Sequence, residues 1–153
     1  MKSASGKAVT LSLKFVNGII EFGPRGDLRK VLEITDQTFD AHHVIPWGKS
    51  THPLVQQAAK AKSVPYHMNH IKNGKAVKKY RFDIPDGIHA NHPAYDAKVE
   101  SHLNSSWNNL VTQYGSESAI PPDVASQVLR DLQNMISNVI DANPGVKIND
   151  LQF

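Results

Sequence analysis

The chain has 153 residues, of which 40% are hydrophobic and 20% charged; this length and composition are typical of one compact domain. No stretch approaches the roughly 18 consecutive apolar residues of a transmembrane helix, and the N-terminus lacks the continuous apolar core of a signal peptide. Cysteine is absent, which excludes disulfides and thiolate-bound zinc. Any bound metal must therefore be held by histidine, carboxylate or water.

The net charge of +3 is distributed unevenly along the chain. Between residues 41 and 82 there is no Asp or Glu, and the cationic residues of this segment are Lys49, Lys60, Lys62, Lys72, Lys75, Lys78, Lys79 and Arg81. From residue 115 to the end, two basic residues stand against five acidic ones. The basic segment suits a polyanion, although a solvated lysine face is the ordinary alternative. The same segment also holds five of the eight histidines: His42, His43, His52, His67 and His70.

The N-terminal third predicts β-structure. In residues 8–22 apolar side chains alternate on both sides of Asn17-Gly18, and this dipeptide is typical of a hairpin turn because both residues accept positive φ. Residues 28–35 are compatible with either a short helix or a strand. Residues 38–46 predict an extended segment that ends near Pro46, since the residue before a proline is disfavoured in a helix.

The remainder of the chain predicts one more strand and three helices. Proline followed by good helix formers indicates a short helix over 53–63, and residues 75–85 have strand character. Apolar residues at helical spacing predict a helix of roughly five turns after Pro93, capped by Asn91 or His92. A second amphipathic helix is expected from Pro121 to Asn143. This order of elements predicts an α+β fold.

Four histidines lie at the ends of predicted elements: His42, His43, His89 and His92. Imidazole is the commonest metal ligand and can accept a proton near neutral pH. An enzyme that cleaves phosphodiesters with a metal needs both functions. Neighbouring strand residues point to opposite faces, so the two adjacent histidines can border one site only where the strand ends or bulges. For the other two, a pair of surface histidines is the ordinary alternative.

Three segments of the sequence carry a resemblance to a known family: TFDAHHVIPW at 38–47, HMNHIKNG at 67–74 and GIHANHPAYDAKV at 87–99. Over about residues 37–112 the chain resembles the AHH family of nucleases in the HNH and endonuclease VII superfamily. The resemblance implies a ββα-metal (His-Me finger) core, in which a hairpin and a helix clasp one divalent ion. Residues 1–36 would then form an N-terminal hairpin extension, 37–112 the core, and 113–153 a C-terminal helical extension of a single nuclease domain.

The resemblance also implies a role for each matching residue. His43 would be the general base, and the metal ligands would be His42, His89 and His92. Asn73 would orient the base, with Asn69 as the alternative, because the segment after Asn73-Gly74 is longer and more basic than the family pattern. The cofactor would be one divalent ion, with zinc, magnesium, manganese and nickel all left open.

The basic link after Asn73 predicts a contact with nucleic acid through Lys75, Lys78, Lys79 and Arg81. Tyr80 and Phe82 interleave with these cations, a pattern that suits phosphate contacts together with base stacking. Lysines that protect an edge strand from aggregation are the alternative.

The activity implied by the resemblance is metal-dependent, largely non-specific endonuclease cleavage, with DNA preferred over RNA. Many such nucleases are the C-terminal tips of secreted bacterial toxins, so we expect the tip domain of a bacterial polymorphic toxin or of a type VI secretion effector. It would act in the cytoplasm of a target cell and have an acidic immunity protein as partner. Two other classes stay open: a nucleic-acid-binding module with a structural, histidine-bound metal, and an interaction domain with incidental histidines.

The remaining aromatic residues and histidines are assigned by their pattern. The predicted core includes Trp47, Trp107 and Met135, and Tyr95 is expected to pack because it lies one turn into an amphipathic helix. Four histidines have no evident partner and are expected at the surface: His52, His67, His70 and His102.

Overall fold

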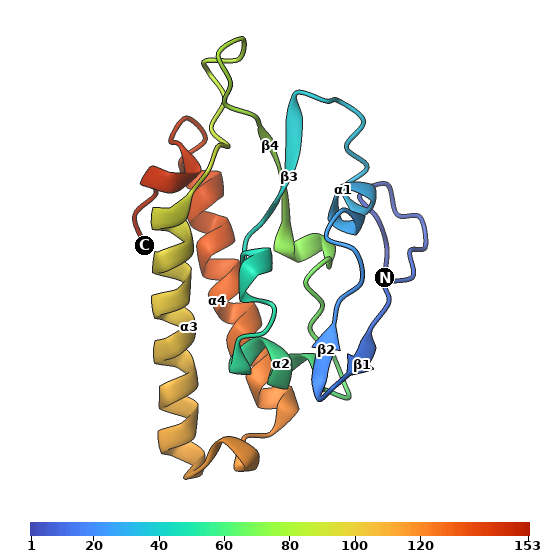
Figure 1. Cartoon of the computed structure of the whole chain (residues 1–153), viewed down its shortest axis with the longest axis vertical. Helices are drawn as coiled ribbons and strands as arrows, with labels where there is room; N and C mark the ends of the chain where they lie inside the picture. The colour runs from blue at the N-terminus through green and yellow to red at the C-terminus, as the bar shows by residue number, and fades with distance from the viewer.

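Two small antiparallel sheets and four α-helices make up the fold (Figure 1), which confirms the predicted α+β class. The computed structural model describes all of residues 1–153. The long helices α3 (Pro93–Tyr114) and α4 (Pro122–Ala142) run side by side in opposite directions. The strands β3 (Phe39–His43) and β4 (Gly74–Lys78) form the second sheet. The short helix α1 (Asp27–Val31) lies beside this sheet, on the side away from α3 and α4.

The predicted N-terminal hairpin is present but shorter than expected. Strands β1 (Lys14–Val16) and β2 (Ile19–Glu21) pair through three residues each, and the turn has φ of 50° at Asn17 and 82° at Gly18. Residues 9–13, which alternate as a strand does, belong to neither strand. The ambiguous segment 28–35 contributes to helix α1, which buries Leu28 and Val31.

Strand β4 is also shorter than the predicted 75–85, because it ends at Lys78. Beyond Lys78 the chain makes a tight loop and returns, so that Ile88 and His89 donate their backbone N–H groups to the carbonyl of Lys78 at 3.0 Å. The N–H of Tyr80 in turn donates to the carbonyl of His89 at 2.8 Å. His89 is therefore fixed through its backbone against the end of β4.

Each of the three longer helices begins with a proline at its first position: α2 (Pro53–Ala59), α3 and α4. Proline suits this position because its missing N–H would have no partner within the helix. Helix α3 ends at Gly115, whose φ of 82° is the left-handed conformation that favours glycine. None of the helices combines the length and the hydropathy that a membrane crossing requires.

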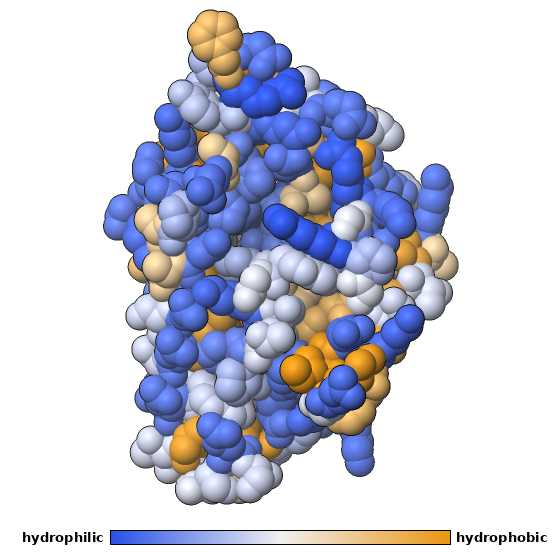
Figure 2. Space-filling view, in the orientation of Figure 1, coloured by the Kyte–Doolittle hydropathy of each residue, from blue (hydrophilic) through white to orange (hydrophobic).

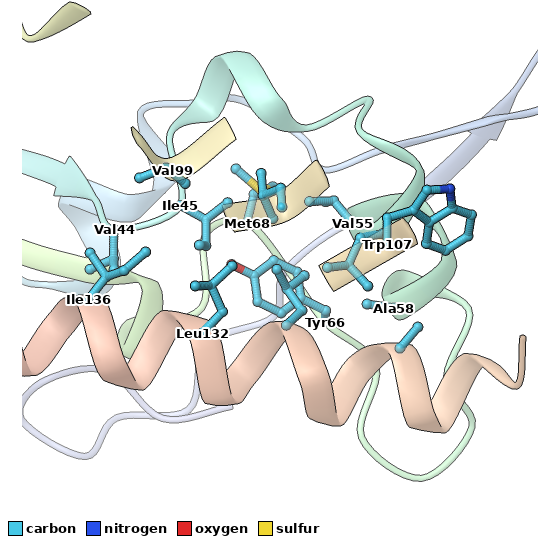
Figure 3. Packing of buried hydrophobic residues seen from close by; sticks show 14 of the residues in the cluster. Val44, Ile45, Val55, Ala58, Tyr66, Met68, Val99, Trp107, Leu132 and Ile136 are labelled. Atoms are coloured by element: carbon cyan, nitrogen blue, oxygen red, sulfur yellow. The ribbon is translucent and has the colours of Figure 1, made fainter. Parts of the chain in front are cut away.

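The buried core is one cluster of 23 residues that runs in sequence from Phe22 to Leu151. Figure 3 shows Val44 and Ile45, which follow β3, packed with Met68 and Tyr66 above Leu132 and Ile136 of helix α4. The backbone that leads away from His42 and His43 is therefore anchored in the core.

Two assignments from the sequence are wrong. Met135 is 39% exposed, because the face of α4 that is buried runs through Leu129, Leu132 and Ile136 instead. His67 is buried rather than at the surface, and its Nε2 bonds the carbonyl oxygen of Ser12 at 3.1 Å. Trp107 and Tyr95 are buried as predicted.

The face of the molecule in Figure 2 is mostly hydrophilic. Hydrophobic side chains gather there over the β1–β2 hairpin, where Phe15, Val16 and Ile19 are exposed. A further hydrophobic residue, Phe82, is fully exposed in the loop that follows β4.

Gly87 allows the return of the chain to β4, and we expect Gly87→Ala to destabilise the protein. A Cβ at this position would lie 1.8 Å from the carbonyl oxygen of Lys79, which forces the backbone of 87–89 away from the strand. Overpacking of this kind costs about 1–3 kcal/mol, measurable as the free energy of unfolding in urea. Gly145→Ala is the matched control, because nothing lies within 4 Å of its added Cβ. Equal stability of the two variants would contradict the role given to Gly87.

Candidate active site

Three of the predicted site histidines converge from three places in the fold. His42 is the last but one residue of β3, His89 follows the loop after β4, and His92 immediately precedes α3. One ring nitrogen from each lies within 4.8 Å of the other two, and the ring centroids are 5.1–5.2 Å apart. This trio is the group of side chains that could hold a metal ion.

Two aspartates set the orientation of two of these rings. Nδ1 of His89 donates to Asp40 at 3.1 Å, and Nδ1 of His92 donates to Asp96 at 2.9 Å. Because an ionised carboxylate only accepts hydrogen bonds, Nδ1 carries the proton in both rings and Nε2 keeps its lone pair. Asp40 lies two residues before His42 and therefore on the same face of β3, which explains how both contact His89. Such carboxylate partners are typical of metal-binding histidines.

His42 lies at the centre of the trio and is 1% exposed. Its Nδ1 is 3.2 Å from Nε2 of His89; since Nε2 of His89 has the lone pair, His42 is the donor. The other nitrogen of His42, Nε2, is buried and has no hydrogen-bond partner. Burial, followed by the neighbouring His89 and His92, lowers the pKa of His42 well below its usual range. A buried, unpaired lone pair of this kind is costly unless a ligand uses it.

His43 points away from the trio toward the segment that carries Asn69. Its Nε2 is 3.0 Å from Oδ1 of Asn69. The amide nitrogen of Asn69 donates to the carbonyls of Phe22 at 3.2 Å and Pro24 at 2.9 Å. Because both amide protons are thus engaged, Oδ1 must face His43, and Nε2 of His43 must carry the proton.

The other nitrogen of His43 is free to accept. Nδ1 is buried and has no partner, and the ring lies beside Trp47 with 5.4 Å between the ring centroids. Burial lowers the pKa of His43 to about 4, although the hydrogen bond that His43 donates to Asn69 acts in the opposite direction. His43 is therefore neutral at physiological pH, with an available lone pair on Nδ1.

Asn73, the first choice for orienting the base, contacts the backbone instead of the ring. Its Oδ1 accepts from the N–H of Ile45 at 2.7 Å, and its amide nitrogen donates to the carbonyls of Ile45 and Met68. The hydroxyl of Tyr95 donates to the carbonyl of Val44 at 2.6 Å. These contacts fix the chain directly after β3, so Asn73 acts on the position of His43 only through the backbone.

A cavity of about 120 Å³ is lined by all four histidines: His42, His43, His89 and His92. Arg25 also lines it; this side chain is exposed and takes part in none of the ion pairs of the chain. No sequence pattern indicated Arg25, which lies in an irregular loop without a motif. Asp40 and Asp96 were not predicted either, although Asp96 follows His92 by four residues at the start of a helix, a spacing that predicts contact.

Every cation of the predicted nucleic-acid-binding set lies in an ion pair. Lys75 pairs with Asp141 at 2.6 Å, Lys79 with Asp40 at 3.4 Å, and Arg81 with Asp83 at 3.2 Å. Lys78 pairs with Asp86. The acid-free segment of the sequence therefore meets carboxylates from other segments in the folded chain, so a run of like charge does not translate directly into a charged surface. The nucleic-acid contact of these four residues stays a prediction.

Comparison with known proteins agrees with this geometry. A family model described as a nuclease family of the HNH and endonuclease VII superfamily with conserved AHH matches residues 27–136. The AHH of that description corresponds to Ala41, His42 and His43, the end of β3. Neither a curated protein nor a solved structure matches the chain. Since the matched residues make up more than half of the sequence, the chain belongs to the AHH family of nucleases.

Proposed function

We propose that this nuclease is a metal-dependent endonuclease that hydrolyses the phosphodiester bonds of DNA with little sequence preference. The observation that carries the proposal is the pairing of functions in one cavity: three histidines that could share a cation, and beside them a buried histidine with a free lone pair. Each function alone has other uses, but hydrolysis of a phosphodiester with a metal requires both.

The residues present fit a divalent ion. His42, His89 and His92 offer neutral nitrogen ligands, two of them oriented by carboxylates. Nδ1 of His42 and Nε2 of His89 lie 3.2 Å apart, close enough to bind one ion in place of the hydrogen bond between them. When bound, the ion would supply a positive charge that stabilises the phosphoryl and leaving oxygens of the substrate. Nitrogen ligands suit zinc and nickel, while the set is compatible with other divalent ions at lower affinity.

In this mechanism His43 is the general base. Its Nδ1 would accept the proton of the attacking water, because this is the ring nitrogen that no protein group occupies. Asn69 holds the opposite nitrogen and so keeps the productive tautomer. When Nδ1 takes the proton, the imidazolium formed is stabilised by the Oδ1 of Asn69, to which Nε2 continues to donate.

Arg25 would bind the substrate at the rim of the cavity. Its guanidinium has no carboxylate partner and can donate two parallel hydrogen bonds to a phosphate. Its charge already acts on the site, since it contributes, after burial, to the lowered pKa of His43. The exposed Phe82 and the ion-paired cations of 75–81 would contact the flanking nucleotides, because exposed ion pairs are worth only about 0–1 kcal/mol and a phosphate can replace the carboxylate.

The alternative, a structural metal in a non-catalytic nucleic-acid-binding module, is less well supported. Structural zinc sites are closed by four protein ligands, whereas catalytic sites keep a position open. Only three side chains form the cluster, and the nearby Asp40 and Asp96 are occupied by their bonds to Nδ1 of the histidines. A structural site would also leave the free lone pair of His43 without a function.

We extend the proposal to the biological setting. The domain would be the toxin of a secreted antibacterial effector, delivered into the cytoplasm of a target cell and neutralised in the producer by an immunity protein. The support is the resemblance over residues 37–112 together with the unpaired Arg25 at the cavity, which an acidic partner could cover to block the substrate.

The first prediction from the proposed mechanism distinguishes the general base from the metal ligands. With Mg²⁺, Mn²⁺, Ni²⁺ or Zn²⁺ added, the protein is expected to nick supercoiled plasmid. His43→Ala should lower the nicking rate by about 10²–10⁴-fold while it retains the ion, because it removes only the proton acceptor. His89→Ala should lose both the ion, measured by elemental analysis, and activity. His102→Ala is the control for loss of a histidine outside the cavity. Equal loss of metal in the first two variants would contradict these roles, and a folded wild type that nicks with none of the ions would refute the proposal.

The second prediction concerns the tautomer of His43. Nitrogen chemical shifts of the histidine rings should show the proton of neutral His43 on Nε2 in the wild-type protein, because Oδ1 of Asn69 can only accept. Asn69→Ala should lower the nicking rate by about 10–100-fold with the metal retained. Asn73→Ala, the matched amide, should lower the free energy of unfolding by about 1–3 kcal/mol and leave the tautomer unchanged. A wild-type proton on Nδ1 would rule out the assigned base nitrogen.

The third prediction tests Arg25 as a phosphate-binding residue. Arg25→Gln should weaken DNA binding and reduce the salt dependence of affinity by about one phosphate contact, without changing the metal content. Lys14→Gln removes a charge from the exposed β1 strand and serves as control. Binding to oligonucleotides can be measured by fluorescence anisotropy at several salt concentrations in the His43→Ala background, which prevents cleavage. The same salt dependence in both variants would exclude Arg25 from the interface.

A further inference from the structure

A second polar cavity lies between the segment 64–72 and helix α4, and it shares no lining residue with the histidine cavity. Its volume is about 260 Å³, close to the lower end of about 300 Å³ for small-molecule sites. The residues that line it include His70 and Lys72 from the segment and Arg130, Gln133 and Asn134 from α4.

The charge of this cavity is not compensated within the chain. No carboxylate lines it, and neither Lys72 nor Arg130 takes part in an ion pair. This differs from the neighbouring cations of 75–81, each of which has an aspartate partner. Burial, followed by the charges of Arg130 and Lys72, lowers the pKa of His70. Both cations therefore act electrostatically on the ring of His70, and no carboxylate lines the cavity to offset them.

Gln133 provides a second, independent observation. Its side chain lines the cavity and is only 2% exposed, yet its amide makes none of the side-chain hydrogen bonds within the chain, whereas the buried Asn69 and Asn73 use theirs fully. The hydroxyl of Tyr66, which also lines the cavity, is fully buried and has no hydrogen-bond partner. A ligand in the cavity would satisfy both N–H donors and the carbonyl acceptor of Gln133.

We propose that this cavity binds a phosphate-bearing ligand of nucleotide size. Arg130 can donate two parallel hydrogen bonds to a phosphate, and Lys72 adds a compact positive charge; both are common in phosphate-binding sites. Gln133 and Asn134 supply the mixed donors and acceptors that match the edge of a base or a sugar. The site goes beyond the proposed nuclease activity and does not depend on it, because none of its residues belongs to the histidine cavity.

The phosphate can come from two sources. A free mononucleotide would fill the cavity as a separate ligand, and a backbone phosphate would place the cavity on the path of a bound nucleic-acid strand. Arg130 also donates to the carbonyl of Val64 at 2.9 Å, so removing it could disturb the loop. Asn134 is exposed and makes no side-chain hydrogen bond in the chain, which makes Asn134→Asp a mild way to introduce a negative charge at the site.

The experiment is a titration followed by NMR at the side-chain amide of Gln133, in the metal-free His43→Ala protein. Adenosine 5′-monophosphate should shift this signal, while adenosine should not. Lys72→Gln and Asn134→Asp should each weaken the binding at least tenfold, and Lys62→Gln, which removes a cation outside the cavity, should leave it unchanged. A tetranucleotide without terminal phosphates separates the sources: a shift indicates backbone phosphate, and a response to the mononucleotide alone indicates a free nucleotide.

Two results would overturn the proposal. One is a Gln133 signal that neither the mononucleotide nor the tetranucleotide moves at millimolar concentration. The other is binding of equal strength in the wild type and in Asn134→Asp, measured with both proteins folded. Failure of plasmid nicking, in contrast, would refute the nuclease proposal and leave this one standing.

Discussion

The hydrogen bond between Asn69 and His43 is the contact on which the arrangement of the site depends. Asn69 is fully buried in a turn of the chain, and its side chain joins this turn to two distant segments. These are the loop after β2, through the carbonyls of Phe22 and Pro24, and the end of β3, through His43. The backbone N–H of Asn69 is held in turn by Nδ1 of His67. The N-terminal part of the chain therefore fixes the orientation of the ring, in addition to covering the core.

Two buried ring nitrogens of the site have lost contact with water without gaining a hydrogen bond within the chain. Within the chain, each of the buried rings of His42 and His43 has one nitrogen bonded and one without a partner. The buried amide of Asn73, in contrast, has all its polar atoms paired, with the backbone of Ile45 and Met68. Unsatisfied polar atoms that cluster in one cavity are expected at a functional site, where ligand binding and proton transfer use them. The same reasoning singles out the hydroxyl of Tyr66, which lines the second cavity and has no partner.

The sequence predicted those features that depend on local pattern. The turn at Asn17-Gly18, the prolines that begin α2, α3 and α4, and the meeting of His42 with His89 and His92 could all be inferred from residue type, order and resemblance. Contacts between distant segments could not: Lys75 lies in a run without acids but pairs with Asp141 of α4, and Arg25 reaches the cavity from an irregular loop. The choice between Asn69 and Asn73 likewise depended on side-chain direction, because both are buried amides on one short segment.

That segment, residues 66–73, links the two cavities physically. The chain turns at Met68 and Asn69, so that Asn69 bonds His43, Met68 packs into the core, and His67 and His70 border the second cavity. A ligand that contacts Lys72 and His70 would act on the same few residues that hold the tautomer of His43. Coupling between two sites requires that each ligand bias a common element. The common element here would be the backbone between His67 and Asn73. It is anchored at one end by the hydrogen bond from the N–H of Asn69 to His67 and at the other by the side chain of Asn73.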